Sequence, residues 1–220
     1  MSDDIFIHAD RALMVIYNNM AREFQNLSTT LGFDELNVME TRRTVNAMYA
    51  RMNQIILNSY ADVAGKAYRD ADDEVGVDDD FNPVAFVASI MSAYNPVSDF
   101  VYTREWTRKR DRLFESIIAT ERGNQEMRQN LKRGLDVLAN QVRQYADMVT
   151  INARIRAFER AGVEYGRWVA EDDGKTCSVC RERNGTVYRL DELPIMPAHW
   201  HCRCQIEPAT EEDFERQNAV

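Results

Sequence analysis

Hydrophobic residues recur at steps of three and four along most of the first 160 residues. This spacing places them on one face of a helix, which a folded protein buries. The pattern therefore predicts a mainly helical N-terminal part. Its first helix carries the buried positions Leu13, Ile16, Tyr17, Met20, Phe24, Leu27 and Leu31.

A second, longer helix is predicted to begin at Asp34, a residue suited to capping a helix N-terminus, and to run to about Asp70. Gly65 weakens the end of this helix, because glycine is a poor helix former. The expected buried face consists of Val45, Met48, Met52, Ile55, Ser59 and Val63.

The segment from Asp70 to Asp80 holds seven acidic residues in eleven positions. A calcium loop of the helix-loop-helix type needs glycine at position 6 and glutamate at position 12. Counted from Asp70, these positions are Val75 and Phe81. The segment is therefore predicted to be a solvated acidic loop without calcium.

Two Asn-Pro pairs divide the middle of the chain. Asn82-Pro83 fits a helix N-cap followed by proline at the first helical position, and it predicts a short apolar helix to Tyr94. Asn95-Pro96 is a second break. The helix after it is expected to end near Gly123, with an apolar face of Trp106, Leu113, Phe114, Ile117 and Ile118.

A last long helix is predicted to end at Ala161-Gly162. Within it Gly134 is expected to be a flaw, costing about 1 kcal/mol relative to alanine. Steps that alternate between three and four are typical of a coiled-coil seam. The seam consists of Met127, Leu131, Leu135, Leu138, Val142, Tyr145 and Val149.

The pattern changes after Gly162. Residues 164–170 contain aromatic and β-branched side chains and predict a strand, and Asn184-Gly185 predicts a hairpin turn. Residues 211–216 predict a short helix. The expected fold class is α+β: a helical bundle or extended helical arm over residues 1–161, followed by a small, zinc-stabilised, β-rich module over residues 162–220.

All four cysteines and two of the three histidines lie in that C-terminal module. Two cysteines in Cys-x-x-Cys spacing can reach one zinc ion, which takes four tetrahedral ligands. A disulfide pair and metal-free cysteines are the alternatives. The candidate zinc ligands are Cys177, Cys180, His199, Cys202 and Cys204, and His201 competes with His199.

The same cluster gives little support for catalysis. The order of its residues differs from the His-x-Glu and Pro-Cys-x-x-Cys signature of zinc deaminases, and no His-Glu-x-x-His motif occurs. A cysteine nucleophile paired with a histidine base remains a rival hypothesis. We predict a non-enzymatic protein with no catalytic residue.

The net charge of −9 disfavours bulk capture of DNA, which depends on neutralising phosphates. Residues 101–160 are the exception, with 13 basic and 8 acidic residues, a net charge of +5. A nucleic-acid-binding zinc protein is therefore a second rival hypothesis. Its contacts would be Arg104, Arg108, Lys109, Arg110 and Arg112, the basic cluster of residues 104–112.

No run of residues approaches the roughly 18 apolar positions of a membrane helix. The start of the chain is acidic, whereas a signal peptide begins with basic residues. We therefore expect no membrane association, and we expect synthesis in a cytoplasm.

The C-terminal motif resembles the phage minor head proteins, the Mu F-like head morphogenesis family. The resemblance covers about 55 residues firmly and the preceding helices only in general character. It is carried by residues 156–163, Trp168-Val169-Ala170, Asp173, Thr176-Cys177-Ser178-Val179-Cys180, Asn184-Gly185, Pro194, residues 197–204 and Pro208.

The resemblance implies a minor capsid protein in the virion of a tailed phage, made in a bacterial cytoplasm and present in multiple copies. It implies contact with the portal protein, and with the major capsid protein or packaged double-stranded DNA as further partners. Head assembly, DNA packaging and DNA ejection are the implied roles. His201 stands where the family more often has a polar residue such as asparagine. The implied cysteine–histidine set is Cys177, Cys180, His199, Cys202 and Cys204, with the fourth ligand open between Cys202 and Cys204.

Overall fold

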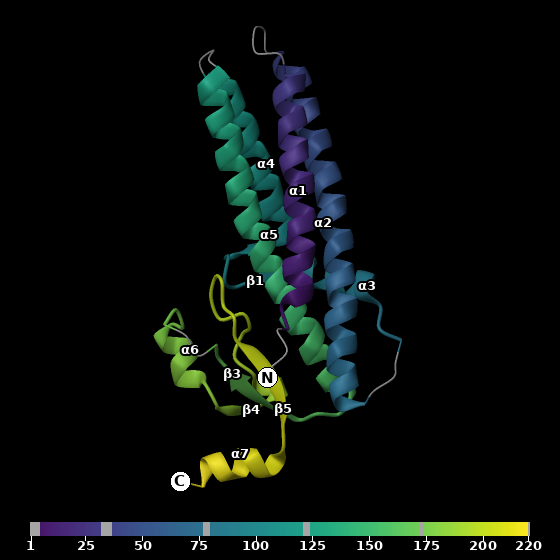
Figure 1. Ribbon diagram of the computed structural model, residues 1–220, viewed down its shortest axis with the longest axis vertical. Helices are drawn as coiled ribbons and strands as arrows, with labels where there is room; N and C mark the ends of the chain where they lie inside the picture. Colours follow the sequence, from purple (N-terminus) through teal and green to yellow (C-terminus); the bar gives the residue numbers. More distant parts are fainter. Residues whose placement is uncertain (1–4, 32–36, 77–79, 121–123, 172–173, 220) are drawn as a thin grey trace.

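Four long helices lie side by side and run alternately in opposite directions along the longest axis of the molecule (Figure 1). They are α1 (Ile7–Thr30), α2 (Val38–Val75), α4 (Tyr102–Ala119) and α5 (Asn124–Arg160). The computed structural model describes residues 5–31, 37–76, 80–120, 124–171 and 174–219. Within these residues, no helix combines the length and the apolar character needed to cross a membrane.

A short helix and a two-stranded ribbon connect α2 to α4. The helix is α3 (Pro83–Ser92), and the ribbon pairs β1 (Tyr94–Asn95) with β2 (Phe100–Val101) in antiparallel register. The Asn82 side chain accepts a hydrogen bond from the Ala85 amide at 3.0 Å. The predicted Asn-Pro helix start is therefore confirmed, although the helix ends two residues before Tyr94.

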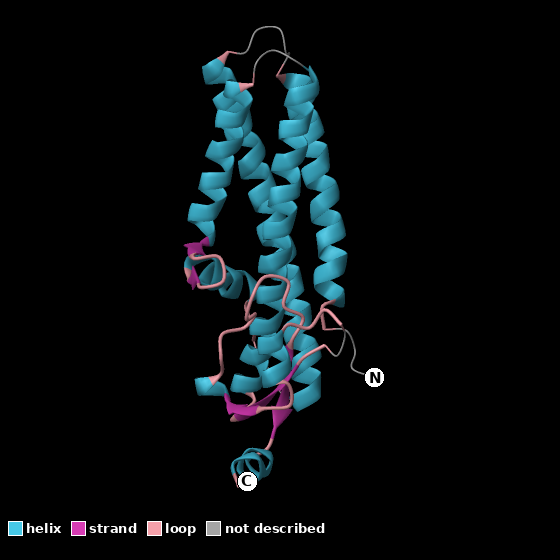
Figure 2. Cartoon of the chain, turned by 90° about the vertical axis from the view of Figure 1, so that its left-hand side faces the viewer, coloured by secondary structure: helices cyan, strands magenta, loops and turns pink. Residues whose placement is uncertain are grey.

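The C-terminal part forms a three-stranded antiparallel sheet at one end of the bundle, beside the last turns of α5 (Figure 2). The strand order is β4-β3-β5, so the strand predicted over residues 164–170 is confirmed as the central one. The elements are β3 (Tyr165–Val169), α6 (Ser178–Arg183), β4 (Val187–Arg189), the 3-10 turn η1 (Leu190–Glu192), β5 (Gln205–Ala209) and α7 (Glu211–Asn218). The predicted α+β class is confirmed.

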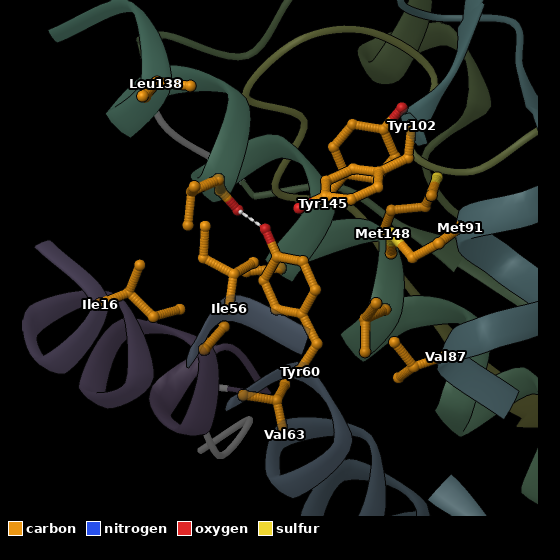
Figure 3. Packing of buried hydrophobic residues seen from close by; sticks show 14 of the residues in the cluster. Ile16, Ile56, Tyr60, Val63, Val87, Met91, Tyr102, Leu138, Tyr145 and Met148 are labelled. Carbon is orange, nitrogen blue, oxygen red and sulfur yellow. Dashed lines mark hydrogen bonds between the residues drawn. The ribbon is translucent and has the colours of Figure 1, made fainter. Parts of the chain in front are cut away.

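The centre of the bundle is filled by apolar side chains from α1, α2, α3, α4 and α5 (Figure 3). The Tyr60 hydroxyl donates a hydrogen bond to the Val142 carbonyl at 2.8 Å, which satisfies the one polar atom of that buried ring. Three details of the predicted faces are wrong. Tyr17 is 45% exposed, Ile118 is 36% exposed, and Ile56 with Tyr60 is fully buried in α2 rather than Ile55 with Ser59.

Helix α2 differs from its prediction at both ends. Its N-cap is Asn37, whose side chain accepts from the amides of Met39 and Glu40, while Asp34 lies outside the described residues. The helix continues to Val75, so the predicted acidic loop from Asp70 is wrong over most of its length. Burial of Tyr68 and Ala71 holds these last turns against the rest of the protein, and Glu74 pairs with Arg154 of α5 at 2.7 Å. Residues 77–79 of the predicted loop lie outside the described residues.

Gly134 in α5 is a point of close packing rather than a flaw. A Cβ atom at this position would lie 3.0 Å from Leu113 Cδ1 of α4 and 3.2 Å from Phe24 Cε1 of α1. The missing side chain therefore lets three helices approach one another. At Gly65 in α2, by contrast, the nearest atoms would be 3.5 Å and 3.7 Å away, which is ordinary contact.

These two glycines should respond to substitution in opposite directions. We expect Gly65→Ala to raise the free energy of unfolding by up to about 1 kcal/mol, the helix-propensity gain of alanine. Gly134→Val should lower it by about 1–3 kcal/mol, because the added atoms overpack the contact with Leu113 and Phe24. Urea unfolding followed by circular dichroism measures both. A Gly134→Val protein as stable as the wild type would show that these neighbours move freely.

Candidate metal centre

Helix α6 supplies the first two cysteines. Cys177 is the N-cap of this helix, and its sulfur accepts a hydrogen bond from the Cys180 amide at 3.4 Å. Cys180 lies in the first turn and is buried. A helix start of this kind turns two cysteines spaced by two residues toward the same point, as a shared metal ion requires.

The predicted hairpin at Asn184-Gly185 is wrong, although the turn itself is present. Because α6 precedes it, the turn joins a helix to β4 rather than two strands. The Asn184 side chain accepts from the Ala170 amide at 2.9 Å, and the Gly185 amide donates to the Trp168 carbonyl at 2.8 Å. These bonds fix the end of α6 against strand β3.

The loop between η1 and β5 supplies the other three candidates, His199, Cys202 and Cys204. The Cys202 amide donates to the His199 carbonyl at 3.2 Å, which folds the loop into a turn. His199 Nδ1 lies 2.8 Å from the Trp200 carbonyl oxygen. Because a carbonyl only accepts, Nδ1 carries the proton, and Nε2 presents a lone pair to the cysteines.

The five side chains converge around Cys180. His199 Nε2 lies 3.2 Å from Cys177 Sγ and 3.1 Å from Cys180 Sγ, and Cys180 Sγ lies 3.8 Å from Cys202 Sγ. Two sulfurs bound to one tetrahedral zinc ion at its usual bond length are about 3.8 Å apart. The spacing between Cys180 and Cys202 is therefore that of two sulfurs bound to one ion.

The cluster divides into two overlapping groups, each with ligand atoms within 4.8 Å of one another. One contains Cys177, Cys180 and His199, and the other contains Cys180, Cys202 and Cys204. Cys180 belongs to both, so a four-ligand site draws its last member from the second group. Both Cys202 and Cys204 are buried beside Cys180, and the cluster could hold a metal ion with either.

Electrostatics separate the four thiols. The hydrogen bond from the Cys204 thiol lowers the pKa of Cys202, and the reciprocal bond raises the pKa of Cys204. Burial raises the pKa of Cys180. The backbone amide of Cys180 donates a hydrogen bond to the Cys177 sulfur and lowers the pKa of Cys177. Without a cation, negative charge is thus stabilised on only some of the sulfurs. A bound metal ion removes this restriction, because it stabilises each thiolate directly.

His201 is next to this cluster in sequence but does not join it. Its backbone amide donates to Gln144 Oε1 of α5 at 3.2 Å, and its side chain is exposed. Its backbone adopts a left-handed conformation, with φ of 58°. His201 lines the same small pocket as Cys177, Cys180 and Cys204, but among the two histidines only His199 has a ring nitrogen within 3.2 Å of a cluster sulfur.

Two amides on α5 that the sequence analysis did not single out hold the ligand-bearing loop. Gln144 binds the His201 amide, and Asn152 Nδ2 donates to the Met196 carbonyl at 3.4 Å. Asp147, between them, is buried, and this burial raises its pKa to about 7 against the opposing effect of Arg143. In the sequence, these three polar residues interrupt the apolar positions of α5, and this interruption could have indicated that they bind another segment.

The predicted basic cluster on α4 does not form one uniform patch. Arg104, Arg108 and Arg112 recur at four-residue spacing and line an open groove, together with the acids Asp111 and Glu115. The Arg108 guanidinium also lies 4.1 Å from the centre of the Phe100 ring. Arg110 pairs with Asp111 at 2.9 Å, and Lys109 borders a different cavity, shared with α5.

The fold and the cluster together define a class: an elongated helical bundle whose last helix carries a small cysteine- and histidine-rich sheet module. Comparison with protein families refines this class. Residues 110–207, from within α4 through the middle of β5, match the family described as phage Mu protein F like protein. This match confirms the resemblance seen in the motif and supports a phage head morphogenesis family. Searches of curated proteins and of solved structures found no match.

The two histidines provide a matched test of the metal site. We expect His199→Ala to lose most of the bound metal, because Nε2 is the only non-sulfur ligand atom in the two groups. His201→Ala should retain it, since the His201 side chain lies outside the cluster. Elemental analysis of the purified proteins gives the metal-to-protein ratio. Equal metal content in the two variants would contradict this assignment.

Proposed function

We propose that this protein is a minor capsid protein of a tailed phage, located at the portal vertex or on the inner capsid surface. In this role it aids head assembly and the packaging or ejection of DNA. The observation that carries the proposal is the family match over residues 110–207, which includes all five candidate ligands. Portal protein is the proposed main partner, and major capsid protein a further one.

We further propose that the metal is Zn²⁺ and that its role is structural. The donor set of thiolates and one imidazole suits zinc, and the spacing between the donors fits a tetrahedral ion. Cys180, Cys202 and Cys204 are buried, whereas Cys177 and His199 are partly exposed. Five candidate ligands are enough to fill all four positions of a tetrahedral zinc ion, and a site filled by protein ligands favours a structural role over catalysis.

Zinc binding would supply stabilising free energy that the small sheet cannot gain from its own hydrophobic core. A segment of about 50 residues rarely sustains a hydrophobic core alone, and structural zinc contributes about 10–16 kcal/mol of apparent binding free energy to folding. Trp168, at the centre of β3, is the largest buried side chain of the module. Metal binding would fix α6 and the ligand loop over the same sheet, and so present a rigid knob beside α5.

A second candidate function is contact with packaged DNA through α4. The observation that favours it is the row of Arg104, Arg108 and Arg112 along one open groove. Cationic side chains in such a row can neutralise phosphates without reading base sequence. Asp111 and Glu115 line the same groove and oppose this binding.

Metal removal tests the structural role of the site. After treatment with a zinc chelator, we expect trypsin to cut rapidly between Lys175 and Arg203, while far-UV circular dichroism retains most of its helical signal. The reason is that α1, α2, α4 and α5 pack mainly on one another, while Cys180, Cys202 and Cys204 add only one edge to the common buried cluster. The control is the same protein with zinc restored, which should regain resistance. Unchanged resistance after complete metal loss would contradict a structural zinc site.

The virion role is tested by composition. Particles produced from the source genome are purified, and quantitative mass spectrometry measures this chain relative to portal protein. We expect a fixed, low ratio that survives nuclease and high-salt washing, because a structural component is held by specific contacts. A chain absent from mature particles would exclude the minor capsid role and leave a transient assembly function.

A further inference from the structure

A separate cavity of about 300 Å³ lies between α4 and α5. It belongs to the half of the bundle remote from the metal module, where α4 and α5 lie side by side (Figure 1). The family-level function leaves it unassigned. It is lined by Tyr49, Lys109, Arg112, Leu113, Ser116, Asn130, Arg133, Gly134 and Val137.

The charge of this lining is entirely positive. Lys109, Arg112 and Arg133 contribute three cations, and no carboxylate lines the cavity. Among the residues that the structure describes, none of the three has an ion-pair partner, whereas nearby Arg110 is paired with Asp111. Burial lowers the pKa of Lys109, and Arg108 and Arg112 add to this effect despite the opposing charge of Glu105. The cavity therefore gathers three cations without an ion-pair partner in the described part of the chain, although Glu105 acts on Lys109 and Arg112 also borders the groove that holds Asp111 and Glu115.

The floor of the cavity is apolar. Leu113 is buried, Gly134 adds no side chain, and Val137 is 48% exposed at the edge. Tyr49 lies at the cavity wall with its ring buried. Neutral polar atoms are few, since Asn130 already donates to Thr120 at 2.9 Å. A ligand that matches this surface therefore needs both negative charge and an apolar group.

We infer that this cavity is the docking site for an acidic peptide segment of a partner protein, which places an apolar side chain on the floor and carboxylates against the three cations. Charge complementarity and the apolar floor are the grounds for choosing this occupant. A nucleic-acid backbone would satisfy the cations but has no apolar side chain for the surface formed by Leu113 and Val137. The inference does not depend on the metal site or on the virion role.

The test uses the full-length, metal-loaded protein and a short fluorescein-labelled peptide of alanine and glutamate with one central leucine. Fluorescence anisotropy measures its affinity, together with that of a peptide with alanine in place of the leucine and of a duplex DNA. The cavity variant is Lys109→Gln/Arg112→Gln/Arg133→Gln. The matched control, Arg43→Gln/Arg128→Gln/Lys132→Gln, removes the same charge from exposed positions outside the lining.

We expect the leucine peptide to bind, to weaken as salt screens the cations, and to lose affinity by about tenfold or more in the cavity variant. The control variant should change the affinity by less than about threefold, since its side chains are exposed to solvent and none of them lines the cavity. Removing the leucine should also weaken binding. Because Lys109 is half-buried, Arg133→Glu, at an exposed position, repeats the test if the triple variant unfolds.

Three results would overturn the inference. The first is no binding of the leucine peptide to the wild-type protein. The second is equal loss of affinity in the cavity and control variants, which would indicate general electrostatic attraction. The third is duplex DNA binding through the same three cations as tightly as the leucine peptide, which would make the cavity part of a nucleic-acid surface.

Discussion

The packing of one continuous helix, α5, is the constraint on which the rest of the structure depends. Its first turns lie against α1, α2 and α4, and its last turns support the sheet module and the ligand loop. A helix of 37 residues is about 55 Å long, so it can serve both regions without a break. The Tyr60–Val142 bond marks the first environment, and Gln144 with His201 marks the second.

This shared helix explains how a small metal-binding module can act on a larger assembly. The ligand loop is bound to α5 by side-chain amides, and Trp168, Cys202 and Cys204 belong to the same buried cluster as the helical residues. A force applied to the module is therefore transmitted to the bundle through packed side chains rather than through a flexible linker. That property suits a protein whose proposed role is to hold other subunits in position.

The two surfaces proposed for contact differ in their physical basis. The candidate metal centre brings together cysteine and histidine side chains from α6 and from a distant loop, and a bound ion would link these two segments rigidly. The α4–α5 cavity is formed by side chains whose positive charge the bundle leaves unbalanced. They lie in different regions of the molecule, so under the two proposals the chain would use separate surfaces for separate partners.

Periodicity in the sequence determined the long helices, because burial of one face leaves a regular pattern that needs no knowledge of the partner helix. Local motifs likewise determined the start of α3 at Asn82 and the convergence of Cys177 with Cys180, since both are settled within one helical turn. Only the tertiary structure decided the rest. The acidic residues that follow Asp70 remain in helix α2 up to Val75, because Tyr68 and Ala71 in the same turns are buried in the core. Gly134 leaves room for the side chains of Phe24 in α1 and Leu113 in α4. The position of His199 Nε2 beside two sulfurs depends on a loop whose His201 amide is held by Gln144, more than fifty residues away, and no local pattern encodes such a contact.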